Sequence, residues 1–565
     1  MIRLFGLFAG TLLLFSSCRK DIDTFIPDPI DPTGSALIVN ATIGGRVIME
    51  GGQPAEGAEL RLGNIGEYAD AAGVFRLHEL NVSADQTYLF AELPGFYPAS
   101  RMISTSEGSL EFLSLVLMPK EVIQEIDATQ EAVVELSSDA RIDFMANTLL
   151  TVGGDLYSGA AEVYARWLNP ADPASIEFLP GALLGIGMDE SMRALQDFGV
   201  MVIDLTDPQS EPLRIGLGKE VGLRFPIPSS LLTQAPAEIG LWRFQEVNGF
   251  WERMGTATLE NNYYRAEIGQ TGYWLCAVDH PAVQRQAKII DTDGSPLSFQ
   301  SVSIRIGGAN RYWSGYSNFA GEVKGWFPQD LPLEILLEDD CGEAFYQHSL
   351  GNASNWPVQV VNASGAYDSY LAGSLLDCEL EPVASGYVLL QLPDRDRVLL
   401  TRDGQFSTFF TSCDGEPPLV SGFDFLQEEE SQSVLLETDF MPSAGPLLSC
   451  DGQNEFLAFR LDSDDLVGKY PVGYQQDSIL YLVDDLTGLA FRVLADQPGL
   501  YNVDPGEFVI GTHSTQTIDQ FSVQCRIDHL GQPGDYLSGT LGGFFTDLQG
   551  NAHSIAGSFR AVREF

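Results

Sequence analysis

The stretch ADAAGVFRL, at residues 69–77, combines a tight-turn signal with the start of a buried strand. Asp70 and Gly73 are typical turn residues, and a glycine at this point suits a backbone with positive φ. Phe75 follows two residues later and is expected to drop into a hydrophobic core. From about residue 36 to residue 119, short segments with alternating apolar residues are separated by glycines and prolines, as in strands joined by turns. The stretch therefore predicts a small β-sandwich.

Two later stretches repeat this pattern in weaker form. YSNFAGEV, at residues 316–323, has Asn318 in place of the aspartate and Val323 in place of the phenylalanine. TRDGQF, at residues 401–406, is a shorter echo. Three copies of the pattern predict a string of sandwich modules rather than a solenoid.

Length and composition agree with this organisation. A chain of 565 residues corresponds to about three to five domains. With 44% hydrophobic residues, 57 glycines and 30 prolines, it can form real cores from many short strands. We therefore expect an all-β protein of several tandem β-sandwich domains, transthyretin-like or immunoglobulin-like.

Further segments of the first unit accompany residues 69–77: GRV at 45–47, QPAEGAEL at 53–60 and PGFY at 94–97. Together they resemble the carboxypeptidase regulatory-like domain, whose pattern is G-x-V, then G-x-P-x-x-G-A, then T-D-x-x-G-x-F. The resemblance implies a seven-stranded, transthyretin-like sandwich without catalytic residues. The echo after residue 282 is similar to a degenerate second copy.

Aromatic residues are prominent in the segment that follows, in IGLWRF at 239–244, GFWERMG at 249–255 and GYW at 272–274. This segment resembles the extracellular β-rich module shared by astroprincin and cartilage intermediate layer protein. Two interpretations of the aromatic side chains are open: a platform for carbohydrate, or alternating core residues of strands, which we favour. The residues concerned are Trp242, Trp251, Tyr273 and Trp274.

The beginning of the chain has the layout of a secretory signal. A positive start up to Arg3 precedes the apolar run 4–15, which is shorter than the roughly 20 residues that cross a bilayer. Phe15, Ser16 and Ser17 then precede Cys18 directly. This layout resembles a bacterial lipoprotein signal, and the resemblance implies cleavage between Ser17 and Cys18 with lipid attached to Cys18. Acidic residues soon after Cys18 resemble the export signal of surface lipoproteins in Bacteroidetes-like bacteria.

These observations predict seven segments. They are a signal peptide at 1–17, a Pro/Asp-rich tether at 18–35, a regulatory-like sandwich at 36–119, an astroprincin-like domain at 120–281, a degenerate regulatory-like sandwich at 282–368, a partial sandwich at 369–451 and a C-terminal β domain at 452–565.

The chain is strongly acidic, with 78 acidic against 31 basic residues and a formal net charge of -47. Such a surface repels nucleic acid, which excludes that class of partner. It also repels anionic lipid, so a covalent lipid is the more plausible attachment to a membrane. The negative charge is explained by a need for solubility outside the cell. A more specific explanation is that the surface binds calcium or a basic partner.

Six cysteines are left once Cys18 is assigned to lipidation. An even number in an exported chain indicates disulfides. Of the fifteen pairings that six cysteines allow, we favour the neighbouring pairs Cys341–Cys378 and Cys413–Cys450, because each closes a short loop. Zinc binding is the rival interpretation, but no C-x-x-C pair occurs. Buried free thiols are the third alternative.

No motif for catalysis or for a resident cofactor stands out. The sequence has no H-E-x-x-H, no G-x-S-x-G and no phosphate-binding glycine loop, and its histidines are scattered. Calcium is a weak alternative at Asp291-x-Asp293, at 338–340 and at 462–465, where plain acidic turns are the simpler explanation. We therefore expect no catalytic residue, no metal site and no cofactor.

The sequence thus predicts a non-catalytic lipoprotein of the outer membrane that binds an unknown protein or carbohydrate ligand. Exposure on the cell surface is expected, and a periplasm-facing location is the alternative. Two other functions stay open: an accessory component of an outer-membrane uptake system, and an extracellular hydrolase, which would need one deep pocket with convergent titratable groups.

Overall fold

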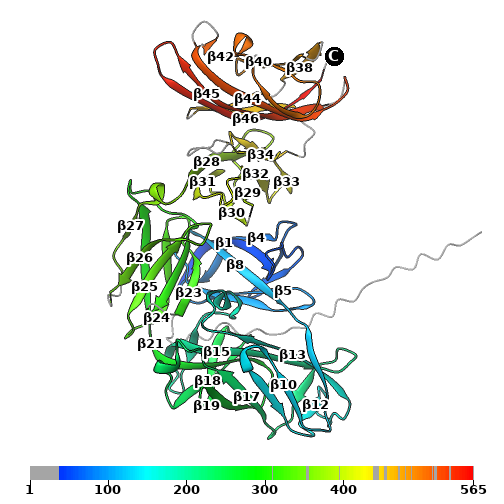
Figure 1. Cartoon of the computed structure of the whole chain (residues 1–565), viewed down its shortest axis with the longest axis vertical. Helices are drawn as coiled ribbons and strands as arrows, with labels where there is room; N and C mark the ends of the chain where they lie inside the picture. The colour runs from blue at the N-terminus through cyan, green and yellow to red at the C-terminus, as the bar shows by residue number, and fades with distance from the viewer. Residues whose placement is uncertain are drawn as a thin grey trace, which may run out of the picture.

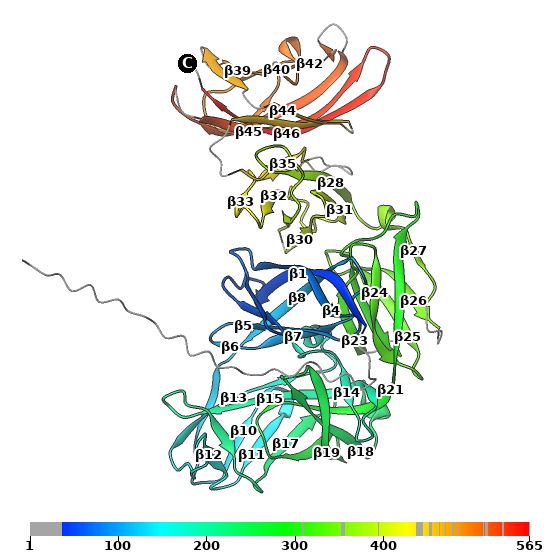
Figure 2. The same ribbon diagram turned by 180° about the vertical axis from the view of Figure 1, so that it is seen from behind.

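The computed structural model describes the chain from residue 37 to residue 563 with gaps. The described ranges are 37–307, 310–351, 356–393, 395–436, 444–450, 455–462, 464–468, 471–476, 479–484, 486–511, 513–514, 518–533 and 536–563. Almost all regular structure in them is strand, and the strands form tandem β-sandwiches. We number the units 1 to 5 in chain order. Figures 1 and 2 show unit 5 at one end, unit 4 beneath it, unit 1 beside unit 3 in the middle, and unit 2 at the other end.

Unit 1 is a sandwich of two four-stranded sheets, ordered β4-β1-β8-β6 and β3-β2-β5-β7. It has one strand more than the seven that the family resemblance implies. Its core is built from alternating apolar residues that include Phe75 and Leu115. Its strands are β1 (Ile38–Met49), β2 (Glu59–Leu62), β3 (Ile65–Tyr68), β4 (Val74–Ser83), β5 (Thr87–Glu92), β6 (Phe96–Tyr97), β7 (Ala99–Ile103) and β8 (Ser109–Pro119).

Unit 2 contributes most strands of a 13-stranded sheet that continues into unit 3. The link is the last strand of unit 2, whose 20 residues pair with unit 2 strands in its first half and with unit 3 strands in its second. The elements are β9 (Val122–Asp127), β10 (Ala132–Glu135), η1 (Ser137–Asp139), β11 (Arg141–Phe144), β12 (Leu149–Thr151), β13 (Ala160–Leu168), η2 (Pro173–Phe178), β14 (Leu184–Ile186), β15 (Met192–Thr206), β16 (Leu213–Ile215), β17 (Val221–Pro226), η3 (Leu232–Gln234), β18 (Glu238–Gln245), β19 (Phe250–Glu260), β20 (Tyr263–Ile268) and β21 (Gly272–Asp291).

Units 3 and 4 are smaller sandwiches. Unit 3 packs the sheet β23-β22-β25-β26 against the second half of β21 with β24 and β27. Unit 4 packs β31-β28-β35 against β30-β29-β32-β33. Their elements are β22 (Ser301–Ile306), β23 (Asn310–Tyr316), β24 (Glu322–Pro328), β25 (Leu333–Glu338), β26 (Ala344–Leu350), β27 (Gln359–Val361), η4 (Ala363–Gly365), β28 (Ser369–Leu376), β29 (Gly386–Gln391), β30 (Asp396–Leu400), β31 (Gln405–Phe410), β32 (Leu419–Asp424), β33 (Glu429–Glu430), β34 (Val434–Leu435) and β35 (Leu447–Leu448).

Unit 5 closes the chain with sheets ordered β37-β36-β46-β45-β44-β41 and β38-β39-β40-β42-β43. Arg460 donates to the carbonyl of Ala372, 3.0 Å away, which helps to join unit 5 to unit 4. Its elements are β36 (Phe456–Leu461), β37 (Asp464–Gly468), β38 (Val472–Gln476), β39 (Ile479–Asp484), β40 (Leu489–Leu494), β41 (Gly499–Asn502), η5 (Pro505–Glu507), β42 (Val509–Ile510), β43 (His513–Ser514), β44 (Ile518–Leu530), β45 (Tyr536–Asp547) and β46 (Ala552–Val562).

The three turn stretches form one repeated device. Gly73, Gly321 and Gly404 have φ of 74°, 74° and 71°. In each copy the glycine carbonyl accepts a hydrogen bond of 2.7 Å from an amide of the strand that enters the sandwich, at Val47, Ile289 and Leu375 respectively. In the first two copies an Asp70 or Asn318 side-chain oxygen also accepts the amides two and four residues ahead. Asn318 therefore replaces the aspartate without loss of the turn.

We expect Gly73→Ala to destabilise unit 1 by about 3 kcal/mol, because it combines backbone strain at positive φ with a steric clash. A β-carbon at Gly73 would lie 2.3 Å from the carbonyl oxygen of Val47. Gly57→Ala is the matched control, since Gly57 also has a φ of +74° but no heavy atom within 4 Å of that position. The control should cost only about 1 kcal/mol. Calorimetric unfolding of residues 19–565 measures both, and equal losses would contradict the account.

Candidate functional site: a cavity at a four-unit junction

The outer face of β8 is the surface on which four units meet. On one face of its C-terminal half, Leu115 and Leu117 lie in the core of unit 1. On the other face, Leu110 and Phe112 pack with residues of units 3 and 4, and Met118 belongs to a core shared by units 2 and 3. Both faces of β8 are therefore covered, as in the inner strand of a layered sheet.

Aromatic contacts fill one end of this junction. The ring of Phe112 lies 4.9 Å from that of Tyr316 in an edge-to-face arrangement, and 5.8 Å from that of Phe299. Tyr387 and Leu400 of unit 4 belong to the same cluster. Edge-to-face pairs at these separations are favourable beyond the area that they bury.

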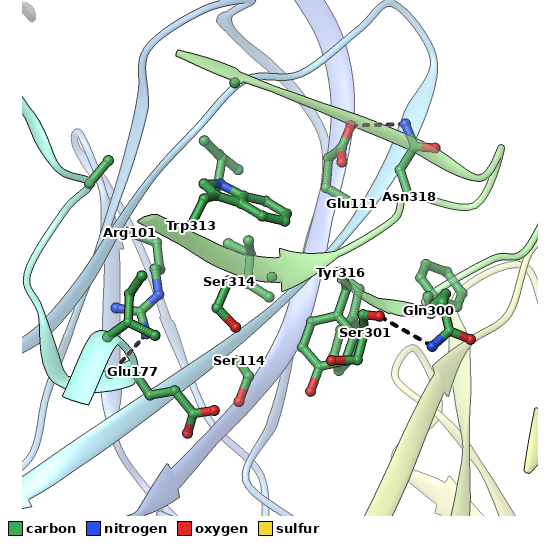
Figure 3. Close-up of a pocket in the computed structure, with 18 of the residues that line it drawn as sticks. Arg101, Glu111, Ser114, Glu177, Gln300, Ser301, Trp313, Ser314, Tyr316 and Asn318 are labelled. Atoms are coloured by element: carbon green, nitrogen blue, oxygen red, sulfur yellow. Dashed lines mark hydrogen bonds between the residues drawn. The ribbon is translucent and has the colours of Figure 1, made fainter. Parts of the chain in front are cut away.

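Next to the aromatic cluster the packing opens into a cavity of about 460 Å³. Figure 3 shows Ser114, Trp313, Ser314 and Tyr316 around it, with Arg101 to one side. Its walls come from β8 and β7 of unit 1, η2 of unit 2, β23 of unit 3 and β30 of unit 4. Ligand pockets of proteins commonly have volumes of roughly 300–1,000 Å³, so the cavity has the size of a small-molecule site.

Most cations that line the cavity are engaged in contacts between units. Arg101 donates to the carbonyls of Leu179 and Glu177, at 2.9 and 2.6 Å, at the C-terminal end of η2. Lys324 of unit 3 donates to Asp85 of unit 1 at 3.1 Å and to the Thr105 carbonyl at 3.1 Å. These side chains hold the walls of the cavity in place, because each donates hydrogen bonds to acceptor groups of another unit.

Side-chain hydrogen bonds also join unit 1 to unit 4. Arg46 donates to Asp396 at 2.7 Å, and Tyr387 donates to Asp70 at 2.9 Å. Arg76 reaches the carbonyls of Gly386 and Thr401. The turn that decides the fold of unit 1 is thus also its contact with unit 4.

A buried ion pair and a disulfide join units 3 and 4. Arg397 lies 3.2 Å from Asp340, with side chains that are 13% and 8% exposed. Asp340 also accepts the amide of Thr411 at 3.0 Å. The neighbouring Cys341 is bonded to Cys413, with their Cα atoms 5.6 Å apart. This bond links the β25–β26 turn of unit 3 to the loop after β31 of unit 4.

The disulfide pairing differs from the sequence-based expectation. The structure joins Cys341 to Cys413 and Cys378 to Cys450, each across 72 residues. The predicted pairs Cys341–Cys378 and Cys413–Cys450 are therefore wrong. Short sequence separation was a poor guide, because the turn of unit 3 that carries Cys341 lies against unit 4. Cys276 and Cys525 are buried free thiols.

Glu111 is a residue of the cavity wall whose side-chain pKa is shifted by burial. Its Oε1 accepts a hydrogen bond from the Asn318 amide at 3.4 Å. Burial raises the pKa of Glu111 to about 7, because desolvation outweighs the hydrogen bonds from Ser109 and Asn318. Burial therefore favours the protonated carboxyl of Glu111 more than it is favoured in a free glutamate.

We expect the stability of Glu111→Gln relative to the wild type to increase as pH rises from about 4.5 to about 7. In that window the folded wild type binds more protons than the unfolded chain, so its stability falls with increasing pH. Glutamine does not titrate, and the difference should grow by at most about 1.4 kcal/mol per pH unit. Calorimetric unfolding of both proteins at about pH 5 and about pH 8 measures it. A difference that is independent of pH would contradict the assignment.

The aromatic residues proposed as a carbohydrate platform are not on a surface. Trp242 and Trp251 are fully buried, and Tyr273 and Trp274 are 3% and 2% exposed. The Trp251 indole donates to the carbonyl of Ala182. They are core residues of unit 2, which confirms the favoured interpretation and excludes the platform.

The acidic turns considered for calcium bind backbone amides. Asp291 accepts the amide of Ala363 at 2.9 Å, and Asp293 that of Ser295 at 2.8 Å. Asp339 accepts the amides of Cys341 and Glu343. Across the part of the chain that the structure describes, no group of three or more His, Cys, Asp or Glu side chains is arranged to hold a metal ion.

The residues assigned to targeting, Ser17 and Cys18, lie outside the described residues, as does the tether. Within the ranges that are described, no helix is long and apolar enough to cross a membrane.

Sequence reasoning did not single out Ser114, Trp313, Ser314 or Glu111. One signal was available: residues 112–118 read FLSLVLM, which is apolar at nearly every position rather than at alternate ones. Such a run indicates a strand that is covered on both faces. It could have shown that β8 lies at an interface.

Comparisons with known proteins leave the chain without a family. No protein-family model and no curated protein matches it, so the resemblances to regulatory-like and astroprincin-like domains stay predictions. Solved structures match with TM-scores that are too low to carry an argument. A streptococcal ancillary pilin matches at 9% identity over 39% of this chain and 96% of its own, with a TM-score of 0.13.

Two further structures match at a similar level. A membrane-associated protein of unknown function from Bacteroides fragilis matches at 11% identity over 43% of this chain and 99% of its own, with a TM-score of 0.14. The major pilin subunit BcpA of Bacillus cereus matches at 8% identity over 76% of this chain and 95% of its own, with a TM-score of 0.12. The class that the chain's own architecture defines is that of tandem β-sandwich proteins.

Proposed function

We propose that the chain is a lipid-anchored protein of the bacterial outer membrane, exposed on the cell surface, which binds a protein or glycan ligand without turning it over. The observation that carries the binding function is the cavity at the locked junction of units 1 to 4, whereas the anchor and the location rest on the resemblance of residues 1–18 to a lipoprotein signal. A site between units that are already held together is preorganised, so a ligand does not have to order them when it binds.

The chemistry of the cavity wall supports binding rather than catalysis. Arg46, Arg101, Lys324 and Arg397 each contact a carbonyl or carboxylate of another unit. They are therefore used to hold the walls together. Ser114, Trp313, Ser314 and Tyr316 are half-buried polar side chains of the wall that a ligand can reach. These groups suit hydrogen bonding, and within the described residues no hydrogen bond places the hydroxyl of Ser114 or Ser314 on a base, as covalent catalysis by a serine would need.

The anchor is tested by Cys18→Ser in the bacterium that makes the protein. We expect the variant to leave the membrane pellet and appear in the soluble fraction, because it has no thiol to carry lipid. Ser17→Ala is the matched control, since it keeps a small residue at the cleavage site and should stay in the pellet. Antibody labelling of intact cells then reports exposure. A Cys18→Ser protein that stays membrane-bound would contradict the anchor.

The binding function is tested with the lipid-free chain, residues 19–565, immobilised and exposed to glycans, matrix proteins and outer-membrane extracts. We expect it to retain a ligand that can be recovered unchanged. Failure to retain any ligand, together with turnover of a peptide or glycoside, would contradict the proposal in favour of a hydrolase.

A further inference from the structure

We infer that the junction cavity binds a neutral saccharide; the inference rests on the proposed binding function and names the class of ligand. It starts from four polar side chains in the cavity wall. Ser114, Trp313, Ser314 and Tyr316 line the cavity, and each of them is half-buried, so water or a ligand can reach it. Polar groups in such a wall are satisfied by protein, water or a ligand.

These four side chains form a set suited to sugars. Serine and tyrosine hydroxyls both donate and accept, and the indole donates, so they can match the alternating donors and acceptors of sugar hydroxyls. Trp313 and Tyr316 also present flat apolar surfaces, against which the C–H face of a sugar ring can pack. Figure 3 shows Ser114 of β8 on the same side of β23 as Ser314 and Tyr316, whereas Trp313 lies on the other side of that strand.

The position of Ser114 is unusual for its strand. Along the outer face of β8 it stands between Phe112 and Val116, which are both buried, and it pairs with Arg46 in the parallel ladder. An apolar side chain at residue 114 would extend the hydrophobic junction. The serine instead places a polar group in the middle of the interface, next to the cavity.

The charges of the wall disfavour an anionic ligand. The side chains that line the cavity include seven acidic residues and five basic ones. The acidic residues are Asp85, Glu111, Glu177, Glu322, Asp339, Asp340 and Asp396, and the basic ones are Arg46, Arg101, Lys324, Arg395 and Arg397. Four of the five cations already contact groups of another unit, and Arg395 is exposed to solvent. Asp85, Asp340 and Asp396 are paired with three of these cations. The four carboxyl groups outside these pairs outnumber the two remaining cations, so a carboxylated or phosphorylated ligand is disfavoured.

The cavity is accessible from outside. Gly52 and Glu177 contribute to its wall and are exposed at the surface. The edge of β23 that faces the cavity pairs with no other strand in the described chain, since β23 pairs only with β22. Its backbone N–H and C=O groups add to the donors and acceptors available.

The test is isothermal titration calorimetry of residues 19–565 with the neutral disaccharides maltose, cellobiose and lactose, and with glucuronic acid as the anionic probe. We expect at least one neutral disaccharide to bind and glucuronic acid to bind at least tenfold more weakly. Ser114→Phe fills the cavity and should abolish binding, and Ser314→Ala should weaken it by about threefold to tenfold. Ser407→Phe, on an exposed position of β31, is the matched control and should bind like the wild type.

Three results would overturn the inference: no binding of any neutral disaccharide, equal binding by wild type and Ser114→Phe, or preferred binding of glucuronic acid. The immobilised-chain experiment separates this failure from that of the proposed function. If the wild type and Ser114→Phe retain the same surface ligand, the chain is a binding protein and the cavity is not its site. If neither protein retains a ligand, the binding function itself fails.

Discussion

Replacement of Cys341 and Cys413 together by serine should lower the free energy of unfolding by about 4 kcal/mol, from the chain entropy of the loop that the bond closes. The two residues are 72 positions apart, and a loop of this length leaves the unfolded chain with much freedom once the bond is removed. Because the bond joins unit 3 to unit 4, we also expect faster hydrogen exchange where these units meet, in the β25–β26 turn and after β31.

The second disulfide provides a matched comparison. Cys378 and Cys450 are also 72 residues apart, but both belong to unit 4. Their double serine variant should lose a similar amount of stability, while hydrogen exchange in the β25–β26 turn stays unchanged. Calorimetry and hydrogen-exchange mass spectrometry measure the two effects. Equal exchange of that turn in both double variants would show that the Cys341–Cys413 bond does not hold the units together.

The second large effect is expected from Asp340→Ala. This change leaves the buried Arg397 guanidinium without its carboxylate and the Thr411 amide without its acceptor. Removal of one partner of a buried ion pair typically costs about 3–5 kcal/mol, because the remaining charge is not compensated. Calorimetric unfolding of residues 19–565 measures the loss.

Two controls distinguish this explanation from a general loss of packing. Asp340→Leu combined with Arg397→Leu leaves no uncompensated charge and should cost less than Asp340→Ala alone. Glu50→Ala breaks the pair between Glu50 and Arg166, whose side chains are 32% and 33% exposed, and should cost less than about 1 kcal/mol. A loss of the same size for Glu50→Ala as for Asp340→Ala would contradict a role for burial.

Local features of the fold could be predicted from the sequence because their causes are local. The Asp70–Gly73 turn depends on a side-chain oxygen that caps nearby amides and on a residue that tolerates positive φ. The same device recurs at Asp207, Asp377 and Asp547, each of which accepts the amides two and four residues ahead. Some of the acidic residues of the chain therefore have a structural role, because they cap the backbone amides of hairpin turns.

The cavity and the disulfide pairing could not be predicted because their causes are not local. Ser114 and Trp313 are about 200 positions apart, and nothing in either neighbourhood indicates the other. The pairing of Cys341 with Cys413 depends on how unit 3 rests on unit 4. The burial of the aromatic residues of unit 2 could be predicted, by contrast, because alternating aromatic residues are typical of strands that pack on a core.

The central claim is that units 1 to 4 are locked together around the cavity, and a disulfide map tests its covalent part, the link between units 3 and 4, most directly. Residues 19–565 are digested without reduction, and the linked peptides are identified by mass spectrometry. We predict one linked pair that contains Cys341 and Cys413 and another that contains Cys378 and Cys450. Recovery of Cys341 linked to Cys378, or of Cys341 and Cys413 as free thiols, would contradict the lock between units 3 and 4.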